Sequence, residues 1–139
     1  MRAKKIGERT VTIRLRDTDA TGFLYFTEQL RLAVETLEEL FSVAAMLKQG
    51  KFCLPIVHAE ADYFAPLTVG DVVKIKAARV QLGTSSFTLR YYFLDPQGEE
   101  VGTVTIVHVA IDAKKKSSIS VPPSVVQLLR KLPSIDLKS

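Results

Sequence analysis

The strongest constraint on this sequence is that one long stretch has helical periodicity, whereas most other apolar residues alternate with polar ones. From Thr27 to Gln49, apolar residues recur at three- and four-residue steps, and charged residues occupy the opposite side. This apolar stripe consists of Leu30, Ala33, Val34, Leu37, Leu40, Phe41, Ala44 and Leu47. Gly50 follows where a helix C-terminal cap is expected. So broad a stripe predicts one long helix pressed against a sheet.

The rest of the chain predicts β-strands, because its apolar residues recur with a period of two. In the first strand, Val11, Ile13 and Leu15 share the side expected to be buried. The alternation slips near Ala77, which predicts a β-bulge, and Asp95–Gly98 has the composition of a type I turn. The predicted strands are Glu8–Arg16, Leu54–Phe64, Asp71–Leu82, Phe87–Leu94 and Val101–Asp112, with a short helix over Ser124–Lys131.

The order of these elements predicts an α+β fold. Short connections between the last four strands predict three consecutive hairpins, and hence an antiparallel sheet whose inner face one helix covers. One helix cannot cover both faces of a sheet with such long strands. We therefore expect a second subunit to cover or extend the sheet.

Composition and charge exclude several classes of protein. The chain has 139 residues, enough for one domain, and contains no apolar run long enough to span a membrane. The single cysteine, Cys53, rules out an internal disulfide, and a reducing, cytoplasmic setting is expected. The net charge of +4 is spread along the chain, and its longest basic run is Lys114–Lys116. No aromatic and basic recognition pattern accompanies it, so we expect no nucleic-acid partner.

The segment from Asp17 to Tyr25 is the strongest candidate for a functional site. Asp17 and Asp19 stand beside Gly22, between a predicted strand and the start of the predicted helix. A helix N-terminus carries unpaired N–H groups and a partial positive charge, which suit it to polarising a carbonyl. A nearby carboxylate can then act as base or nucleophile on that carbonyl. The same residues also fit a turn that only caps the helix.

A calcium-binding loop is a competing interpretation of this segment. Asp17, Asp19, Gly22 and Glu28 stand at the spacing of positions 1, 3, 6 and 12 of an EF-hand loop. Thr21, however, replaces the usual ligand at position 5. An EF-hand also needs a helix before the loop, whereas the preceding residues alternate as a strand. We therefore expect no metal here.

The remaining candidate side chains form no known catalytic pattern. His58 and His108 are the only histidines, and their spacing does not fit a zinc site. His108 lies in an apolar strand and is expected to be packed, whereas the face that carries His58 fits either a pocket or a solvated edge. Ser85 follows Gly83 but lies in no nucleophile elbow. No glycine-rich phosphate-binding pattern occurs, so no cofactor is expected.

Three segments of the chain resemble the 4-hydroxybenzoyl-CoA thioesterase-like hotdog family. Arg16–Tyr25, which reads RDTDATGFLY and precedes a long helix, is similar to the active-site segment of the family. Ala61–Asp71 resembles its strand that ends in Pro and Gly-Asp, and Leu82–Phe87 resembles its Gly-x-Ser-Ser turn. The resemblance covers about residues 8–113. It implies a single domain over residues 1–139, with 114–139 as a C-terminal extension.

The resemblance implies a hotdog fold, in which an antiparallel five-stranded sheet wraps around one long helix. It also implies hydrolysis of an acyl-CoA thioester without metal or cofactor, at sites between the subunits of a homodimer or homotetramer. Asp19 aligns with the catalytic carboxylate of the family, which acts as a nucleophile or as a base toward water. Gly22 permits close approach, the backbone N–H near Phe26 polarises the thioester carbonyl, and Tyr25 lines the site.

The resemblance also bears on the substrate. Many bacterial members have a histidine where this chain has Phe26, which favours an aromatic or longer acyl group over a short aliphatic one. Members that act on 1,4-dihydroxy-2-naphthoyl-CoA are also similar and carry a histidine near the position of His58. His58 and Ser85 are therefore further candidates for substrate contact. Arg90 and Lys114–Lys116 are candidates for binding the phosphates of CoA.

The alternative function is a hotdog module that binds an acyl-CoA or acyl-carrier thioester without cleaving it. The presence of Asp19 favours an enzyme, because holding a thioester does not require a carboxylate beside it.

Overall fold

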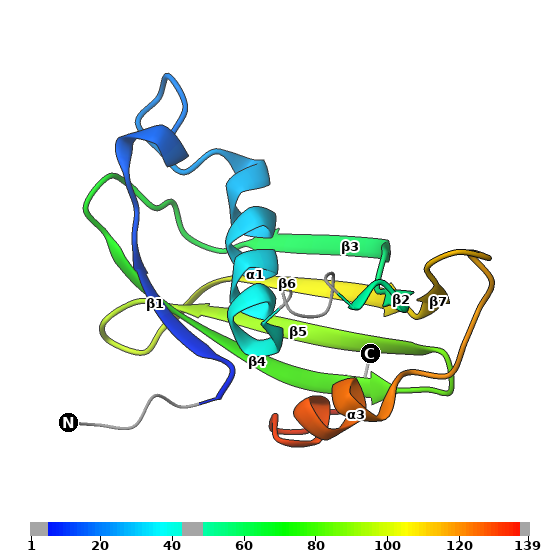
Figure 1. Ribbon diagram of the computed structural model, residues 1–139. Coiled ribbons are helices and arrows are strands. Elements are labelled where there is room, and N and C mark those ends of the chain that lie inside the picture. Colours follow the sequence, from blue (N-terminus) through cyan, green and yellow to red (C-terminus); the bar gives the residue numbers. More distant parts are fainter. Residues whose placement is uncertain (1–5, 43–48, 137–139) are drawn as a thin grey trace.

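The computed structural model describes residues 6–42 and 49–136 (Figure 1). In this part of the chain, five antiparallel strands form one sheet in the order β1-β4-β5-β6-β3. The strands are β1 (Glu8–Thr12), β3 (Ile56–Tyr63), β4 (Val72–Leu82), β5 (Ser86–Leu94) and β6 (Glu100–Val109). The sheet curves around helix α1 (Phe26–Phe41). The predicted α+β class, with a five-stranded antiparallel sheet around one helix, is thereby confirmed.

The core lies between α1 and the concave face of the sheet. Because side chains alternate along a strand, every second residue of β5 points at the helix. These residues are Phe87, Leu89, Tyr91 and Phe93, and all four are fully buried. From α1, they are met by Leu32, Ala33, Leu37 and Phe41. The face of α1 that fixes it across the sheet shares Ala33, Leu37 and Phe41 with the predicted stripe. Leu32 is buried although it was not part of that stripe, whereas Leu30, Val34 and Leu40 are only partly buried.

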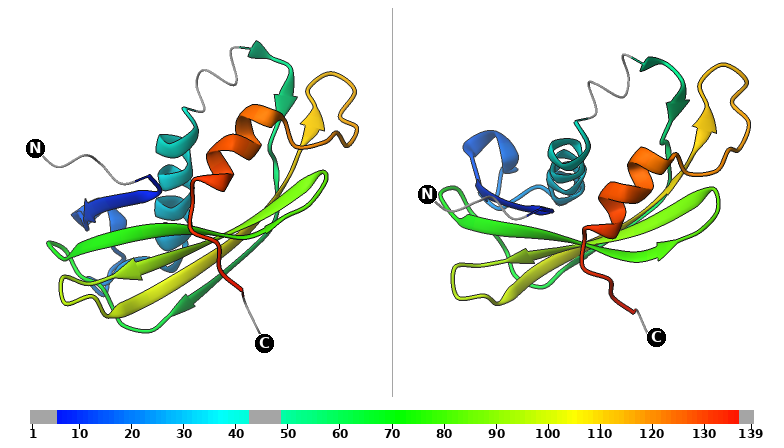
Figure 2. Two further views of the ribbon diagram at one scale, coloured as in Figure 1. Left: turned by 90° about the horizontal axis from the view of Figure 1, so that it is seen from below. Right: turned by 60° about the horizontal axis from the view of Figure 1, so that its bottom comes forward.

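A second helix, α3 (Pro123–Arg130), lies on the same side of the sheet as α1 (Figure 2). It buries Val125 and Leu129 in the core, followed by Leu132. Earlier in the chain, β2 (Phe52–Cys53) and β7 (Ile111–Asp112) pair as a two-stranded sheet, which the sequence did not predict. The C-terminal segment thus supplies part of the hydrophobic core.

The first predicted strand ends earlier than expected. It stops at Thr12, and Leu15 begins a single turn of 3-10 helix, η1 (Leu15–Asp17). The turn forms because the Asp17 carboxylate accepts a hydrogen bond from the Arg14 N–H at 2.8 Å. As a result, Leu15 is 77% exposed and not buried.

The long helix also ends earlier than its periodicity indicated. It was expected to run to Gln49, but α1 ends at Phe41 because Ser42 adopts a left-handed conformation with φ of 49°. Positions 43–48, which include two residues of the apolar stripe, lie outside the described residues. Gly50 does have a positive φ, 64°, but it does not cap α1.

The prediction of three consecutive hairpins is wrong. β4–β5 and β5–β6 are hairpins, but β3 pairs with β6, and β4 pairs with β1. The connection over residues 64–71 crosses the end of the sheet, because backbone bonds tie it to the segment before α1. Leu24 N donates to the Leu67 carbonyl at 2.7 Å, and Phe23 forms a bridge with Thr68. The predicted bulge is confirmed in β4, between Arg79 and Gln81.

Candidate active site

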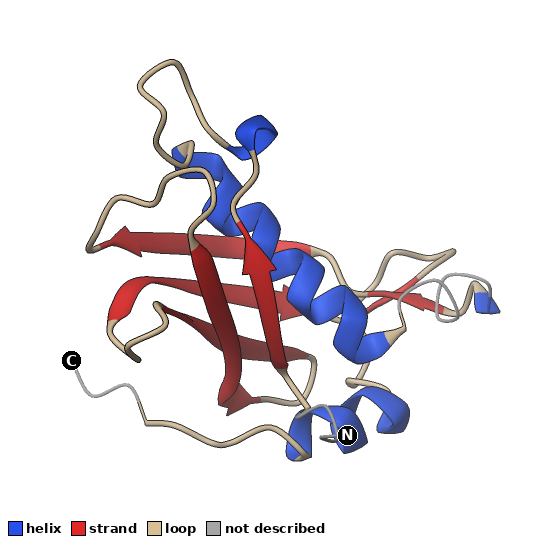
Figure 3. Cartoon of the chain, turned by 90° about the vertical axis from the view of Figure 1, so that its left-hand side faces the viewer, coloured by secondary structure: helices blue, strands red, loops and turns tan. Residues whose placement is uncertain are grey.

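The candidate site is the loop over residues 15–25, which stands at one end of the sheet just before α1 (Figure 3). Its two arms are joined by backbone bonds, since Asp19 N donates to the Phe23 carbonyl at 3.0 Å and Tyr25 N to the Asp17 carbonyl at 2.9 Å. At its tip, Gly22 has φ of 86°, a conformation that a side chain disfavours. The loop is therefore closed on itself and presents the Asp19 side chain outward.

The Asp19 carboxylate is exposed, and one of its oxygens is engaged within the loop. Oδ1 accepts hydrogen bonds from the Thr21 hydroxyl and from the Thr21 N–H, the latter at 2.8 Å. These bonds, that of the hydroxyl foremost, hold the pKa of Asp19 below its usual value. Oδ2 makes no hydrogen bond with any described residue. The site thus offers an ionised carboxylate with one free oxygen.

Asp17 ties this loop to the helix. It is only 4% exposed, and its Oδ1 lies 2.8 Å from Nη2 of Arg31 on α1. Arg31 also pairs with Glu28 and Glu35, and the hydrogen bond to Glu28 is the main cause that raises its pKa. The guanidinium therefore stays charged, and the Asp17–Arg31 pair fixes the loop against α1.

The N-terminus of α1 directly follows the loop. Tyr25 occupies the N-cap position, and its side chain does not cap the helix. Among the residues described, neither the Phe26 nor the Thr27 amide has a hydrogen-bond partner. Since helix N-terminal N–H groups carry partial positive charge, these amides can polarise a carbonyl beside the loop.

An open cavity of about 350 Å³ lies beside this N-terminus. Four of its nine lining residues are aromatic: Phe23 and Phe26 from the loop and helix start, and Tyr63 and Phe64 from the end of β3 and just after it. The Tyr63 hydroxyl donates to the Phe26 carbonyl, which joins β3 to the first turn of α1. Such a wall suits a flat, apolar group.

Apart from His58, the predicted site residues lie at two separate places in the chain, which form two groups. Asp19, Gly22, Tyr25 and Phe26 come together in the loop and at the helix start. Ser85 lies at the other end of the sheet, in the β4–β5 turn, where its carbonyl accepts from the Ala110 N–H at 2.8 Å.

Within one chain, His58 belongs to neither of these two groups. It is exposed near the start of β3, with Nε2 3.6 Å from Glu60, on the face that points away from α1.

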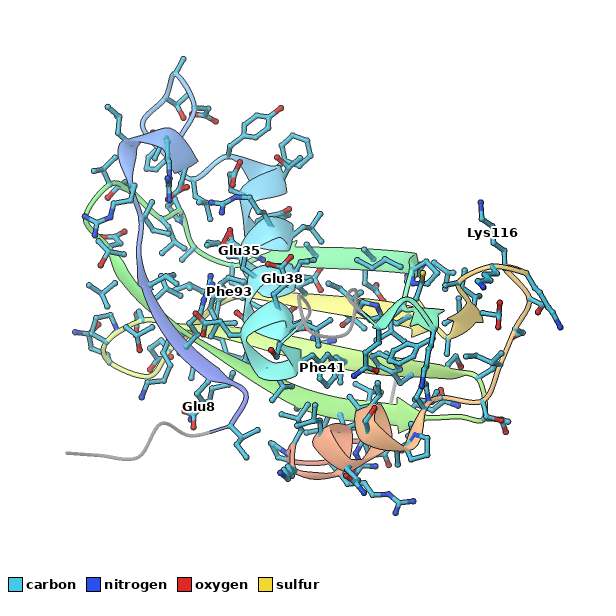
Figure 4. The ribbon with its side chains drawn as sticks, in the orientation of Figure 1. Glu8, Glu35, Glu38, Phe41, Phe93 and Lys116 are labelled. Carbon is cyan, nitrogen blue, oxygen red and sulfur yellow. The ribbon has the colours of Figure 1, made fainter. Side chains whose placement is uncertain are left out.

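The candidate ligands for CoA phosphates also lie away from Asp19. Arg90 is on the outer face of the sheet, where it donates to the hydroxyls of Thr105 at 3.1 Å and Thr103 at 3.4 Å. Lys116 belongs to the loop after β7, at the opposite end of the molecule from residues 15–25 (Figure 4). A single chain therefore does not gather these cations around Asp19.

His108 is packed, as its apolar strand indicated. Its ring is stacked on Phe87 with centroids 4.9 Å apart, and Nδ1 lies 2.9 Å from the Leu54 carbonyl oxygen. Burial lowers the pKa of His108, so it is neutral at physiological pH.

Sequence reasoning missed two features of the site, Gln29 and the Asp17–Arg31 pair. Gln29 is buried on the inner side of α1 and bonds to both β3 and β6. The signal that could have found it is its position four residues before Ala33, which places it on the same face of the helix as the apolar stripe. For Arg31, nothing in the sequence connected it to Asp17, because the loop between them had no predictable shape.

Within the described ranges, no group of three or more His, Cys, Asp and Glu side chains could hold a metal ion. None of the helices described is long and apolar enough to cross a membrane.

Comparison with known proteins places this geometry in a family. A family model described as the thioesterase-like superfamily matches residues 13–129. The chain belongs to this superfamily. A 1,4-dihydroxy-2-naphthoyl-CoA hydrolase from Prochlorococcus marinus is 38% identical over 123 residues, which cover 78% of this chain and 79% of the relative.

Two solved structures have the same fold as this superfamily member. A 1,4-dihydroxy-2-naphthoyl-CoA thioesterase from Synechocystis matches with a TM-score of 0.82 and 24% identity, over 88% of this chain and 94% of that one. A Staphylococcus aureus protein solved in complex with CoA matches with a TM-score of 0.85 and 14% identity, over 99% and 92%. With the superfamily match, they confirm the predicted hotdog fold and the predicted family of thioester hydrolases.

Proposed function

We propose that the protein hydrolyses the CoA thioester of a hydroxylated aromatic acid, with Asp19 as the catalytic carboxylate. The observation that carries this proposal is the ionised Asp19 side chain, held in a hydrogen-bonded loop immediately before an uncapped helix N-terminus. A carboxylate and a carbonyl-polarising group side by side are the two components that acyl transfer to water requires.

In the proposed reaction, the thioester carbonyl oxygen accepts from the Phe26 amide. Asp19 then either removes a proton from water, so that hydroxide attacks the carbonyl carbon, or attacks that carbon itself and forms an anhydride that water cleaves. In the first route the C–S bond breaks as hydroxide adds, and Asp19 returns the proton taken from water to the leaving CoA thiolate. In the second route the C–S bond breaks when the anhydride forms, the thiolate takes a proton from solvent, and the water that later cleaves the anhydride releases its protons to solvent as Asp19 is regenerated. The negative charge that develops on the carbonyl oxygen lies beside the positive end of α1.

The proposed acyl group is of the 1,4-dihydroxy-2-naphthoyl type. Curated relatives at 31–38% identity carry that name, and the cavity beside the helix start has an aromatic wall that suits a fused ring. Phe26 contributes to this wall.

The proposed active form is a homodimer joined along β3. This strand is at the edge of the sheet, so its outer backbone groups are free to pair with another strand. It also exposes apolar side chains, since Ile56 is 45%, Val57 57% and Tyr63 48% exposed. A self-complementary edge of this kind fits a twofold axis.

Such a dimer would join the two groups of predicted site residues. Antiparallel pairing of two β3 strands brings the start of one strand beside the end of the other. The Asp19 loop of one subunit then approaches the end of the partner subunit that carries Ser85 and Lys114–Lys116. A hydroxyl group and cations for the phosphates of CoA would thus be supplied across the interface. A homotetramer of two such dimers would contain the same sites.

The test is the release of free thiol from a panel of aliphatic, benzoyl-type and naphthoyl-type CoA esters. We expect hydrolysis of the naphthoyl-type ester, and a loss of about 10²–10⁴ in kcat for Asp19→Asn. Asp95→Asn is the matched control, because Asp95 is another aspartate whose Oδ1 accepts backbone N–H bonds in a turn.

Two results would contradict the proposed function. One is the absence of thiol release from the whole panel, which together with tight ester binding would favour a non-catalytic binding module. The other is unchanged turnover in Asp19→Asn.

A further inference from the structure

Gln29 is a buried polar residue in the wall of the aromatic cavity. Only 1% of it is exposed, and its Nε2 donates to the backbone carbonyls of Asp62 at 2.9 Å and Thr103 at 3.1 Å. Both N–H bonds are therefore used, and the two carbonyl partners fix which end of the amide is nitrogen. This leaves Oε1 with a defined direction.

The backbone of β6 makes room for this side chain. A Cβ atom at Gly102 would lie 2.6 Å from Gln29 Oε1 and 2.7 Å from Nε2, so close that the Gln29 amide would have to shift. Gly102 therefore leaves room for the Gln29 amide in its present position. The side chain is held by two hydrogen bonds and by contact with the strand beneath it.

Oε1 is an unused hydrogen-bond acceptor among the side chains that line the cavity. No described residue donates to it. The other polar side chain in the wall, Tyr63, donates its hydroxyl hydrogen to the Phe26 carbonyl, so toward a ligand it can only accept. Oε1 is not fully buried in the free protein, and a ligand that excludes water from the cavity would leave it unpaired unless that ligand supplied a donor.

We propose that Gln29 is a specificity-determining residue, whose Oε1 accepts a hydrogen bond from a ring hydroxyl of the acyl group. This inference rests on the proposed function, which places the thioester carbonyl at the Phe26 amide. Gln29 follows Phe26 by three residues, about 4.5 Å along the helix axis. A ring attached to that carbonyl and lying against the aromatic wall extends toward Gln29 over this distance.

The proposal predicts strong discrimination. A site that contains a buried hydrogen-bonding group rejects the analogue without the hydroxyl, because the group is then left unpaired. Wild-type protein should therefore prefer 1,4-dihydroxy-2-naphthoyl-CoA over 2-naphthoyl-CoA by at least about tenfold in kcat/KM.

The experiment measures kcat/KM for these two esters in wild-type protein, Gln29→Met and Gly102→Ala. Met has the length of Gln but lacks the amide, and Gly102→Ala pushes the amide out of place while leaving it in the chain. In both variants we expect the ratio between the esters to fall close to one, mainly through loss on the hydroxylated ester. Thr36→Val is the matched control, because Thr36 is also buried on α1 and bonds only to its own helix, at Leu32. Its ratio should equal that of wild type.

The outcomes separate this inference from the function on which it rests. If wild-type protein hydrolyses neither ester, the proposed function fails and the role of Gln29 fails with it. If wild type hydrolyses both and either folded variant keeps the wild-type ratio, the role of Gln29 is wrong while the function stands. Equal loss on both esters also contradicts it, because that is the result of a purely structural role.

Discussion

At the scale of single residues, the charge of Asp19 depends on its neighbour Thr21. The Thr21 hydroxyl and N–H both donate to Oδ1, and they hold the pKa of this carboxyl below its usual value. Since a lowered pKa means that the carboxylate persists to lower pH, the acid limb of the activity should lie below the range of an ordinary aspartate. Thr21 therefore tunes the pH range of the proposed reaction without touching the substrate.

We expect Thr21→Val to move the acid limb of kcat/KM to higher pH. Loss of the hydroxyl donor raises the pKa of Asp19, so the carboxylate is protonated sooner as the pH falls. Activity at about pH 7.5 should change little, whereas activity at about pH 4.5 should fall relative to wild type. Thr21→Ser keeps the hydroxyl and should keep the wild-type profile. A profile of Thr21→Val that overlays that of wild type would show that Asp19 does not set the limb.

Residues whose surroundings are set by their neighbours in the chain could be identified from the sequence. The pattern of Asp17, Asp19 and Gly22 before a helix singled out this segment, because turn geometry and the helix start depend on neighbours in the chain. The resemblance to a family, and not the pattern, then made Asp19 the catalytic candidate. Gln29 was not predicted, because its partners Asp62 and Thr103 lie on strands far away in the sequence. A polar residue on an apolar stripe signals a buried hydrogen bond but does not say with what.

At the scale of elements, the site depends on how the loop is fixed to α1. The Asp17 carboxylate joins three parts of the chain, since it accepts from the Arg14 N–H and from Arg31 on the helix. Each of these bonds involves a charged group in a half-buried setting, where charge-assisted bonds are strongest. The pair therefore positions Asp19 relative to the Phe26 amide.

We expect Asp17→Asn and Arg31→Gln each to lower kcat by about tenfold, with little change in KM. Each should lower the free energy of unfolding by about 1–3 kcal/mol, because the remaining member of the pair is left without its charged partner in a site that is partly buried. The double variant should lose less than the two single losses combined. Glu35→Gln removes another partner of Arg31 without touching the loop and should keep kcat. Additive losses in the double variant would contradict a positioning role for the pair.

The strands and the start of the helix were predictable, but some ends and connections were not. The alternation of β5 and the stripe of α1 are local patterns that directly reflect which face is buried. The end of α1 depends on one left-handed residue, Ser42, in an otherwise continuous helical pattern. The pairing of β3 with β6 depends on contacts between residues 64–71 and the loop before α1. Such tertiary contacts leave no periodic trace in the sequence.

At the scale of the whole molecule, the predicted site residues lie at two ends of one sheet. Asp19 and the aromatic cavity are at the end where β3 finishes, and Ser85 and Lys116 are at the other. The open edge of β3 offers a way to bring the two ends together in a dimer. Oligomeric state and activity should therefore be linked.

We expect wild-type protein to run as a dimer of 30.8 kDa, which is twice the 15.4 kDa of one chain, in size-exclusion chromatography with light scattering. Val57→Lys places a charge on the exposed side of β3 and should give a monomer with activity reduced at least about tenfold. Val72→Lys is the control, because Val72 is also an exposed valine but lies at the start of β4, away from this edge. A Val57→Lys protein that stays dimeric and active would contradict the proposed interface.

The contact between Gln29 and Gly102 has a consequence for how this family diverges. A side chain at position 102 would occupy the space that the side-chain amide of Gln29 fills. A homologue with a side chain at position 102 would therefore have to move, shorten or lose the glutamine side chain. The two positions should covary among homologues, and each substitution pair should mark a change in the acyl group that the lineage accepts.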